Sequence, residues 1–311
     1  MGVAITTNNE RGIMLYRTYT ANGSLSSTVR LPPTQFKVGI SQTDPSVSTT
    51  SLDVVVPMLD GTFNDDGSNT LTGTNGAANS TDNIAVFKPA GVLTDVTAQN
   101  LLTTGSNATK TWTIANLASA GTVVDKTLPF GLWFYVLDTA TLAKFLIAGT
   151  CLEIRIGSDA SNYYSKTFET TDLAIGWNWI TSNKVNIEDL TETGTVGSPV
   201  DYFEIEIITN NAADAFIAGD VVYDTLRSWA TTDLIQNFVS DYPTFDYTSL
   251  TTTIRCLVNS VQANGFPING VATFNEDTLP LLATVASLND ESKTNTDEFV
   301  YIFKNRIRSE V

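Results

Sequence analysis

Residues 128–229 read LPFGLWFYVLDTATLAKFLIAGTCLEIRIGSDASNYYSKTFETTDLAIGWNWITSNKVNIEDLTETGTVGSPVDYFEIEIITNNAADAFIAGDVVYDTLRSW. Short apolar runs are separated here by Gly, Asn, Asp, Ser and Pro. Within one run Leu152, Ile154 and Ile156 alternate with charged residues, and residues 203–207 repeat the pattern. Successive side chains of a strand point to opposite faces, so each run has one apolar and one polar face. The apolar faces need a second sheet to cover them, and the stretch therefore predicts an antiparallel β-sandwich.

The composition of the whole chain agrees with an all-β protein. Apolar residues make up 42% of the 311 residues and charged residues only 16%, which is typical of a globular protein. Thr, Ser, Asn and Gly are abundant, and long Lys/Glu-rich helical segments are missing. The length favours two domains.

The polar stretch from residue 61 to 82 marks a change of composition and is predicted to be a surface loop without core residues. The end segments are each small for a domain. We therefore expect residues 1–61 and 232–311 to form one discontinuous β domain, with residues 62–231 inserted as a jelly-roll sandwich. Thr232 and Asp233 could cap a short helix from Asp233 to Val239.

The charge balance restricts the partners. The formal net charge is -16, from 33 acidic and 17 basic residues. Such a surface repels phosphate groups, so nucleic acids and anionic membranes are not expected as partners. No apolar run is long enough to span a membrane, so no membrane insertion is expected. The acidic residues serve either solubility alone or cation binding.

The two cysteines, Cys151 and Cys256, lie in apolar runs of different predicted domains. We expect buried free thiols rather than a disulfide. Free thiols fit a protein assembled in a reducing cytoplasm, and the N-terminus shows no secretory signal.

Catalytic motifs are missing from the sequence. It contains no histidine, no phosphate-binding glycine loop and no nucleophile elbow, so an enzyme is not expected. Glu204 and Glu206 share one face of a predicted strand and are the only candidate pair for glycoside hydrolysis. Two glutamates at this spacing more often form a solvated face, so a polysaccharide hydrolase is the weakest alternative.

Oxygen-bearing side chains near predicted strand ends suggest a structural calcium ion. Asp159 and Asp224 are the principal candidate ligands, with Asn162, Asp172 and Asp220 as further oxygen donors. No compact calcium-binding loop accompanies them. Ordinary duty in turns and helix caps is the alternative.

Four aromatic residues are candidates for ligand binding: Tyr163, Tyr164, Trp177 and Trp179. Sugar rings have apolar faces that stack on exposed aromatic side chains. Trp177 and Trp179 are two residues apart and share one face of a predicted strand, whereas Tyr163 and Tyr164 point to opposite faces. The alternative is that the tryptophans belong to the sandwich core.

The end segments resemble a module of bacteriophage tail-fibre and baseplate-type proteins. The resemblance lies in FKVGISQTDPSVSTTSLDVVVP (residues 36–57) and NGFPINGVATFNEDTLPLLATVASLNDESKTNTDEFVYIFKNRIR (residues 264–308). SKTNTDEF and FKNRIR are its most specific parts.

The middle of the chain resembles the jelly-roll, carbohydrate-binding-like domain inserted in many phage and secreted adhesion proteins. The resemblance is carried by LEIRIGSDASNYYSKTF (152–168), GWNWITSN (176–183), VDYFEIEI (200–207) and VVYDTLRSW (221–229), with Asp224 and Arg227 matching the closing motif.

Together these resemblances imply a structural component of a bacteriophage virion in the tail, baseplate, collar or fibre. They imply assembly in the host bacterial cytoplasm, docking onto other virion proteins and symmetric copies, trimers by analogy. The jelly roll would face outward, toward a host-surface glycan. A capsid decoration or head-fibre protein without receptor binding is the alternative.

Overall fold

The computed structural model describes residues 3–6, 33–40, 49, 52, 54–56, 58, 71–74, 77–83, 97–117, 124–183, 185–229, 234–246, 248, 251–260, 262–263, 267–275, 282–292 and 297–306. Within them nearly all regular structure is strand, and the single α-helix, α2, spans Thr139–Leu142. The predicted all-β fold class is confirmed. No helix in these residues is long and apolar enough to cross a membrane.

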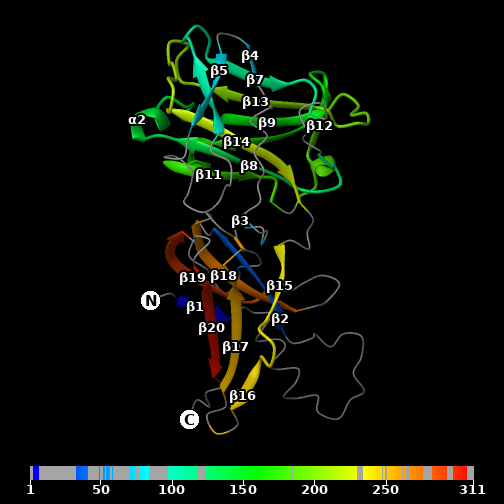
Figure 1. Cartoon of the computed structure of the whole chain (residues 1–311), viewed down its shortest axis with the longest axis vertical. Coiled ribbons are helices and arrows are strands. Elements are labelled where there is room, and N and C mark those ends of the chain that lie inside the picture. The colour runs from blue at the N-terminus through cyan, green and yellow to red at the C-terminus, as the bar shows by residue number, and fades with distance from the viewer. Residues whose placement is uncertain are drawn as a thin grey trace. The chain divides into compact units, whose positions relative to one another are not determined.

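The chain divides into two units whose segments interleave along the sequence (Figure 1). Unit 1 comprises Met1–Gly61, Ala90–Val92 and Thr232–Val311, and unit 2 comprises Thr62–Pro89 and Leu93–Thr231. The sequence-based boundaries, after residue 61 and before residue 232, fall at the same positions. Ala90–Val92 is the one segment assigned differently.

Unit 2 contains two antiparallel sheets. The six-stranded sheet has the order β12 (Thr191–Thr193), β10 (Asn162–Glu169), β9 (Thr150–Asp159), β13 (Tyr202–Ile208), β7 (Thr109–Ile114) and β4 (Thr72–Thr74). The five-stranded sheet has the order β11 (Gly176–Thr181), β8 (Phe130–Val136), β14 (Val221–Ser228), β6 (Thr97–Thr103) and β5 (Ala77–Asn83).

The strand order makes unit 2 a jelly roll. Without the edge strands β4, β5 and β12, the two orders are β6-β14-β8-β11 and β7-β13-β9-β10. Counted along the chain, these eight strands lie in the orders 1-8-3-6 and 2-7-4-5. Two interleaved Greek keys of this kind are the jelly-roll arrangement.

The core of unit 2 lies between the two sheets. It contains the inward-pointing side chains of the strands with alternating sequence. Phe130, Leu132, Phe134 and Val136 point inward from β8 and are fully buried. The opposite sheet contributes the apolar residues of the patterns described above, Leu152, Ile154, Ile156, Phe203, Ile205 and Ile207. Each large apolar side chain buried in this way contributes about 1.5–3 kcal/mol to folding.

The expectation that residues 61–82 form a loop without core residues is wrong. Strand β4 and most of β5 fall within this stretch, and Leu71 is fully buried in the core. Both strands lie at sheet edges, where one neighbour supplies the backbone pairing. An edge strand needs few apolar residues, so its composition resembles that of a loop.

Unit 1 contains two further antiparallel sheets. One has the order β1 (Val3–Thr6), β19 (Leu282–Ser292), β18 (Pro267–Asn275), β2 (Pro33–Ile40) and β15 (Gln236–Asn237), with β3 (Val54–Val55) also paired to β2. The other has the order β16 (Thr244–Asp246), β17 (Thr251–Val258) and β20 (Phe299–Arg306).

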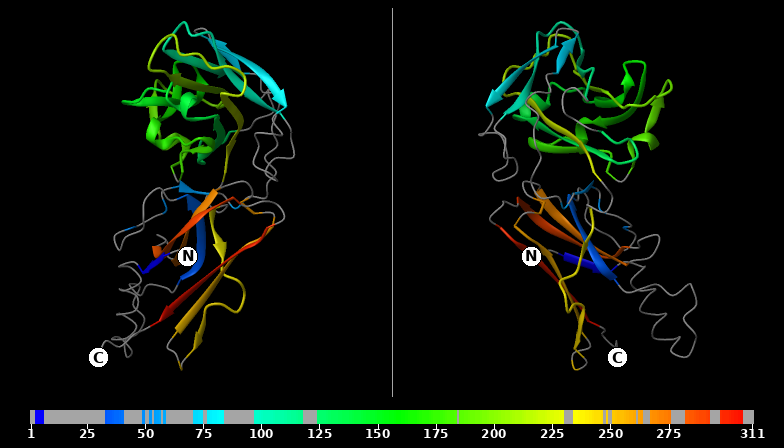
Figure 2. Two further views of the ribbon diagram at one scale, coloured as in Figure 1. Left: turned by 90° about the vertical axis from the view of Figure 1, so that its left-hand side faces the viewer. Right: turned by 45° about the vertical axis from the view of Figure 1, so that its right-hand side comes forward.

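Strands from the two ends of the chain pair directly in unit 1. β2 pairs with β18, placing Val38 opposite Val271, and β1 pairs with β19. The turned views show the blue N-terminal strand β2 beside the orange C-terminal strands (Figure 2). Neither end segment could complete this sheet without the other.

The short helix expected from Asp233 to Val239 is wrong, because Gln236 and Asn237 form strand β15 on the edge of β2. The Phe238 N–H extends this pairing by donating to the Thr34 carbonyl at 3.0 Å. Pairing with a sheet edge overrides the local capping signal. Both cysteines are buried free thiols, Cys151 in unit 2 and Cys256 in unit 1.

Candidate functional site

The outer side of the six-stranded sheet carries a group of charged and phenolic side chains, which we call the carboxylate face. Its members are Glu153, Arg155, Tyr163, Tyr202, Glu204 and Glu206. Register brings them together: Arg155 lies opposite Glu204, and Glu153 lies opposite Glu206. Their neighbours along β9 and β13 point inward, so these side chains must point outward.

Arg155 is the centre of the carboxylate face. Its Nη1 donates to Glu204 Oε1 at 2.5 Å, and its Nη2 lies 2.7 Å from Glu153 Oε2 and 3.1 Å from Glu206 Oε2. The guanidinium also lies over the Tyr163 ring, 5.0 Å from its centroid. The Tyr202 hydroxyl donates to the other oxygen of Glu204. One cation thus holds three carboxylates from two neighbouring strands.

The face carries excess negative charge when all groups are ionised, because three carboxylates and one guanidinium sum to -2. Burial acts to lower the pKa of Arg155, but its hydrogen bond to Glu153 and the three negative charges outweigh burial and raise the pKa. Burial raises the pKa of Glu206, and Arg155 opposes this shift. Burial and the bond to Glu204 raise the pKa of Tyr202.

Hydroxyl groups surround these charges on the same side of the sheet. Register places Ser165 opposite Arg155, Thr167 opposite Glu153, Thr113 opposite Glu204 and Thr111 opposite Glu206. Charged groups with fixed geometry and hydroxyl groups together suit a ligand rich in hydroxyls, because both donate or accept hydrogen bonds.

The two candidate tyrosines lie on opposite sides of the six-stranded sheet. Tyr163 is half-buried on the carboxylate face, opposite Gly157. Tyr164 is 6% exposed and belongs to the core between the sheets. A β-carbon on Gly157 would lie 2.5 Å from the Tyr163 Cα, so this glycine lets the two strands approach closely at the tyrosine.

The two candidate tryptophans lie on the outer side of the five-stranded sheet, in a group that we call the tryptophan face. Its members are Trp133, Tyr135, Trp177, Trp179 and Trp229. Trp177 lies opposite Tyr135 and Trp179 opposite Trp133, so the candidates share a side of β11. Centroid distances are 5.2 Å for Trp133–Trp179, 5.6 Å for Trp179–Trp229 and 6.0 Å for Trp133–Trp177.

The tryptophan face is largely buried. Trp179 is 6% exposed, and Trp133 and Trp229 are more deeply buried, whereas Trp177 is half-buried. Gly131 makes room for this packing: a β-carbon there would lie 2.2 Å from Trp179 Cζ2 and 2.5 Å from Trp229 Cζ3. The four candidate aromatics are therefore divided among two outer faces and the core, and no single site contains them all.

The two candidate calcium ligands also lie in different sheets. Asp159 is exposed at the β9–β10 turn, where its carboxylate accepts hydrogen bonds from the Ser161 N–H and the Asn162 side chain. These bonds lower the pKa of Asp159. Asp224 is 1% exposed on β14, opposite Trp133.

The other oxygen donors have structural partners. Asp220 binds Lys144 at 2.8 Å, and Asp172 accepts from the Glu169 N–H at 2.8 Å. Among the described residues, no group of three or more His, Cys, Asp or Glu side chains could hold a metal ion.

The sequence-based search missed Glu153, Arg155 and Tyr202. Alternation within residues 152–156 already placed Glu153 and Arg155 on the polar face of a strand. The missing information was the register, because nothing in the sequence states that β9 and β13 are neighbours. Glu204 and Glu206 share a face as expected, but Arg155 covers them and Glu204 is only 7% exposed.

Comparison with known proteins gives no family. No family model and no curated protein matches the sequence. Among solved structures, an arabinose-bound GH51 α-L-arabinofuranosidase aligns with 63% of this chain at 12% identity and a TM-score of 0.33. The alignment covers 30% of that chain. A similarity this weak supports no argument about the fold or the activity.

Proposed function

We propose that this chain is a structural component of a bacteriophage virion that presents a jelly-roll module for attachment to a host-surface glycan. Unit 1 docks onto other virion proteins of the tail, baseplate, collar or fibre, and the chain acts in symmetric copies, as trimers. The observation that carries the glycan-binding part is the carboxylate face, where Arg155, three glutamates and Tyr163 lie together among hydroxyls.

The chemistry of the face suits a sugar. Carboxylate and guanidinium groups form strong, directional hydrogen bonds with vicinal hydroxyls, and they are held in place before any ligand arrives. Tyr163 supplies a flat apolar surface for a sugar ring. Strands β9 and β13 lie in the interior of the sheet, so the charged groups are fixed by the scaffold rather than by a loop.

Binding is favoured over hydrolysis. Glycosidases place two carboxyl groups on either side of the scissile bond. Glu204 and Glu206 instead project from one strand and contact the same guanidinium. They cannot flank a bond without first releasing Arg155, so we propose that the protein is not an enzyme.

A second candidate is a capsid decoration or head-fibre protein without receptor binding. It is favoured by the mutual pairing of the charged groups, because Arg155 already contacts all three glutamates. In that case the carboxylate face would be purely structural.

A glycan array with the full chain separates the two candidates. If the face binds sugars, Tyr163→Ala should lower glycan affinity about tenfold or more, because one stacking surface is lost. Glu188→Gln is the control, since Glu188 is exposed and lies outside the face. Equal binding by wild type and Tyr163→Ala, or no binding by the wild type, would reject the carboxylate face as a glycan site.

The virion role has its own test. Phage particles lacking this chain should be incomplete or should adsorb poorly to host cells. Particles that assemble and adsorb normally without it would refute the proposed role in the virion, whatever the array shows.

A further inference from the structure

One end of the jelly roll exposes four large apolar side chains on three neighbouring loops. We call this end the apolar tip and define it by Leu137, Ile147, Ile175 and Ile217. Their exposed fractions are 38%, 73%, 53% and 69%. Most surface residues around them are small and uncharged, including Ala148, Ala174, Ala212, Ala213 and Ala218.

The strand register places these loops at the same end. Val136, the last residue of β8, lies opposite Gly176 of β11 and Val221 of β14. Leu137 follows Val136, Ile175 precedes Gly176, and Ile217 precedes β14. On the other sheet, Thr150 at the start of β9 lies opposite the last residue of β10, and Ile147 precedes it. The chain leaves β14 through Ser228, at the opposite end of the strand.

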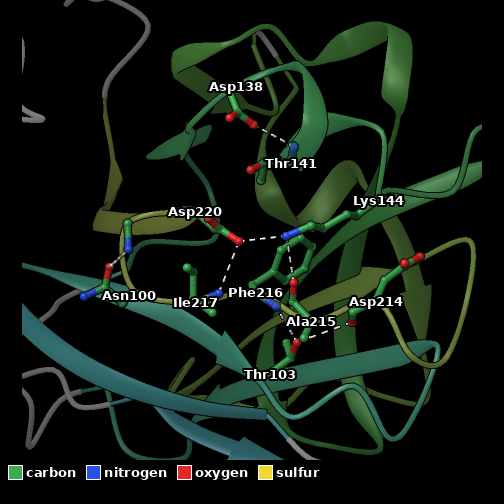
Figure 3. A network of polar contacts seen from close by, with 11 residues as sticks. Asn100, Thr103, Asp138, Thr141, Lys144, Asp214, Ala215, Phe216, Ile217 and Asp220 are labelled. Atoms are coloured by element: carbon green, nitrogen blue, oxygen red, sulfur yellow. Dashed lines mark hydrogen bonds and ion pairs between the residues drawn. The ribbon is translucent and has the colours of Figure 1, made fainter.

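A network of partly buried polar contacts holds two of the loops together (Figure 3). Lys144 Nζ donates to the Ala215 carbonyl and to Asp220 Oδ2, both at 2.8 Å. The same Asp220 oxygen accepts from the Ile217 N–H at 3.2 Å. The Lys144 ammonium therefore links the loop after β8 to the loop before β14.

A second set of bonds fixes the loop that carries Ile147. The Asn210 amide donates to the carbonyls of Ala143 and Phe145, at 2.9 and 2.8 Å, and its Oδ1 accepts from the Ile147 N–H at 3.2 Å. The Thr170 hydroxyl donates to the Leu146 carbonyl at 2.6 Å. The apolar side chains are thus displayed on loops ordered by folding, which lowers the entropy that a partner must overcome on binding.

Apolar side chains gathered in this way on a rigid surface indicate an interaction site. The charges beside them indicate its partner. Asp138 and Asp172 are exposed within the same loops. These loops, residues 137–149, 170–175 and 209–220, contain one lysine, Lys144, and no arginine. Lys144 is occupied by Asp220.

This charge distribution selects among the candidate partners. Anionic lipid would be repelled by Asp138 and Asp172. A second copy of the same tip would bring identical carboxylates together. A protein segment with apolar residues flanked by Lys or Arg complements both features of the tip.

We propose that the apolar tip docks an amphipathic segment of a partner protein whose apolar residues are flanked by basic side chains. This site is separate from the carboxylate face and does not depend on glycan binding.

The test uses the full chain and three fluorescein-labelled synthetic helical peptides of 18 residues. The first has a leucine stripe flanked by lysines, the second has glutamates in place of the lysines, and the third has serines in place of the leucines. Binding is followed by fluorescence anisotropy. The leucine–lysine peptide should bind, and the other two should bind at least about tenfold more weakly.

Substitutions then locate the binding. Ile147→Ser with Ile217→Ser leaves the net charge unchanged and should weaken binding of the leucine–lysine peptide at least about tenfold, because two apolar contacts are lost. Val185→Ser is the matched control, since Val185 is 41% exposed and lies after β11, at the opposite end of that strand. Asp138→Asn with Asp172→Asn should weaken binding less and reduce its dependence on salt.

Three outcomes would overturn the proposal. The first is equal binding of the serine–lysine and leucine–lysine peptides, which would mean attraction to an acidic chain alone. The second is unchanged binding by a folded Ile147→Ser, Ile217→Ser variant, with folding checked by circular dichroism. The third is binding of phosphatidylcholine–phosphatidylglycerol vesicles, or tip-dependent self-association, without tip-dependent peptide binding.

Discussion

The two outer faces of the jelly roll have the same strand geometry and opposite chemistry. On the carboxylate face, one guanidinium holds three carboxylates and a tyrosine ring. On the tryptophan face, indole rings pack against one another around Gly131. Neither is an ordinary solvated sheet surface, because the side chains of both faces are buried or half-buried.

The difference concerns what each face can offer a ligand. Burial of the tryptophans stabilises the domain but removes their flat surfaces from solvent, except at Trp177. The carboxylate face holds its polar groups in a fixed arrangement. A polar group of a ligand could take the place of one of the contacts that these groups make with one another. A ligand-binding role is therefore better supported for the carboxylate face, and a stabilising role for the tryptophan face.

The largest expected effect comes from shortening a buried indole. Trp179→Ala should destabilise the chain by about 3–5 kcal/mol, because it removes contacts with Trp133 and Trp229 and leaves a cavity. Trp177→Ala, on the same strand and face, should cost clearly less because Trp177 is half-buried. Chemical denaturation of both variants measures this. Equal losses would mean that both rings contribute alike.

The next effect belongs to the carboxylate face. Arg155→Met should cost about 3 kcal/mol, because it leaves three partly buried carboxylates without their cation. Combining Arg155→Met with Glu204→Gln and Glu206→Gln should recover part of the loss. The free energy of unfolding at neutral pH is the measurement. A triple variant no more stable than Arg155→Met would show that charge compensation is not the role of Arg155.

A smaller loss of stability is expected from a substitution at Gly131, which leaves room for the indole rings of Trp179 and Trp229. Gly131→Ala should cost about 2 kcal/mol, because its β-carbon would overlap Trp179 and Trp229 and force both rings to shift. Gly197→Ala is the matched control: the nearest atoms to its β-carbon are 3.9 Å away. Thermal unfolding should separate the two variants. Equal melting temperatures would show that the rings of the tryptophan face can shift at little cost in stability.

Alternation in the sequence identified central strands such as β9 and β13 and their polar sides, but it missed the edge strands β4, β5 and β15. It placed Glu204 beside Glu206 and Trp177 beside Trp179, and it predicted the sandwich. It could not supply the register between strands that are distant in the chain, and the contacts of Arg155 with Glu204 and Glu206 depend on that register. It also could not show that both sides of β11 are buried. Ile180 lies in the core between the sheets and Trp179 lies on the opposite side of the strand, and the sequence pattern does not tell these two buried layers apart.

The smallest expected effect is a pH dependence of the carboxylate face. Burial raises the pKa of Glu206 in the folded chain, so the ionised form of this carboxyl group is disfavoured in the folded state relative to the unfolded state. Its stabilising contribution is complete below its ordinary pKa and is lost as the pH rises through the folded value. Glu206→Gln mimics the protonated group, so its stability relative to wild type should be higher at pH 8 than at pH 4.

Urea denaturation at both pH values checks this prediction, with Glu188→Gln as the exposed control. A relative stability that falls between pH 4 and pH 8 would mean that the ion pair with Arg155 outweighs the burial of Glu206. In that case the carboxylate face, like the tryptophan face, would be a region whose contacts stabilise the fold. The predicted rise would instead show that Arg155 does not fully offset the cost of burying ionised Glu206.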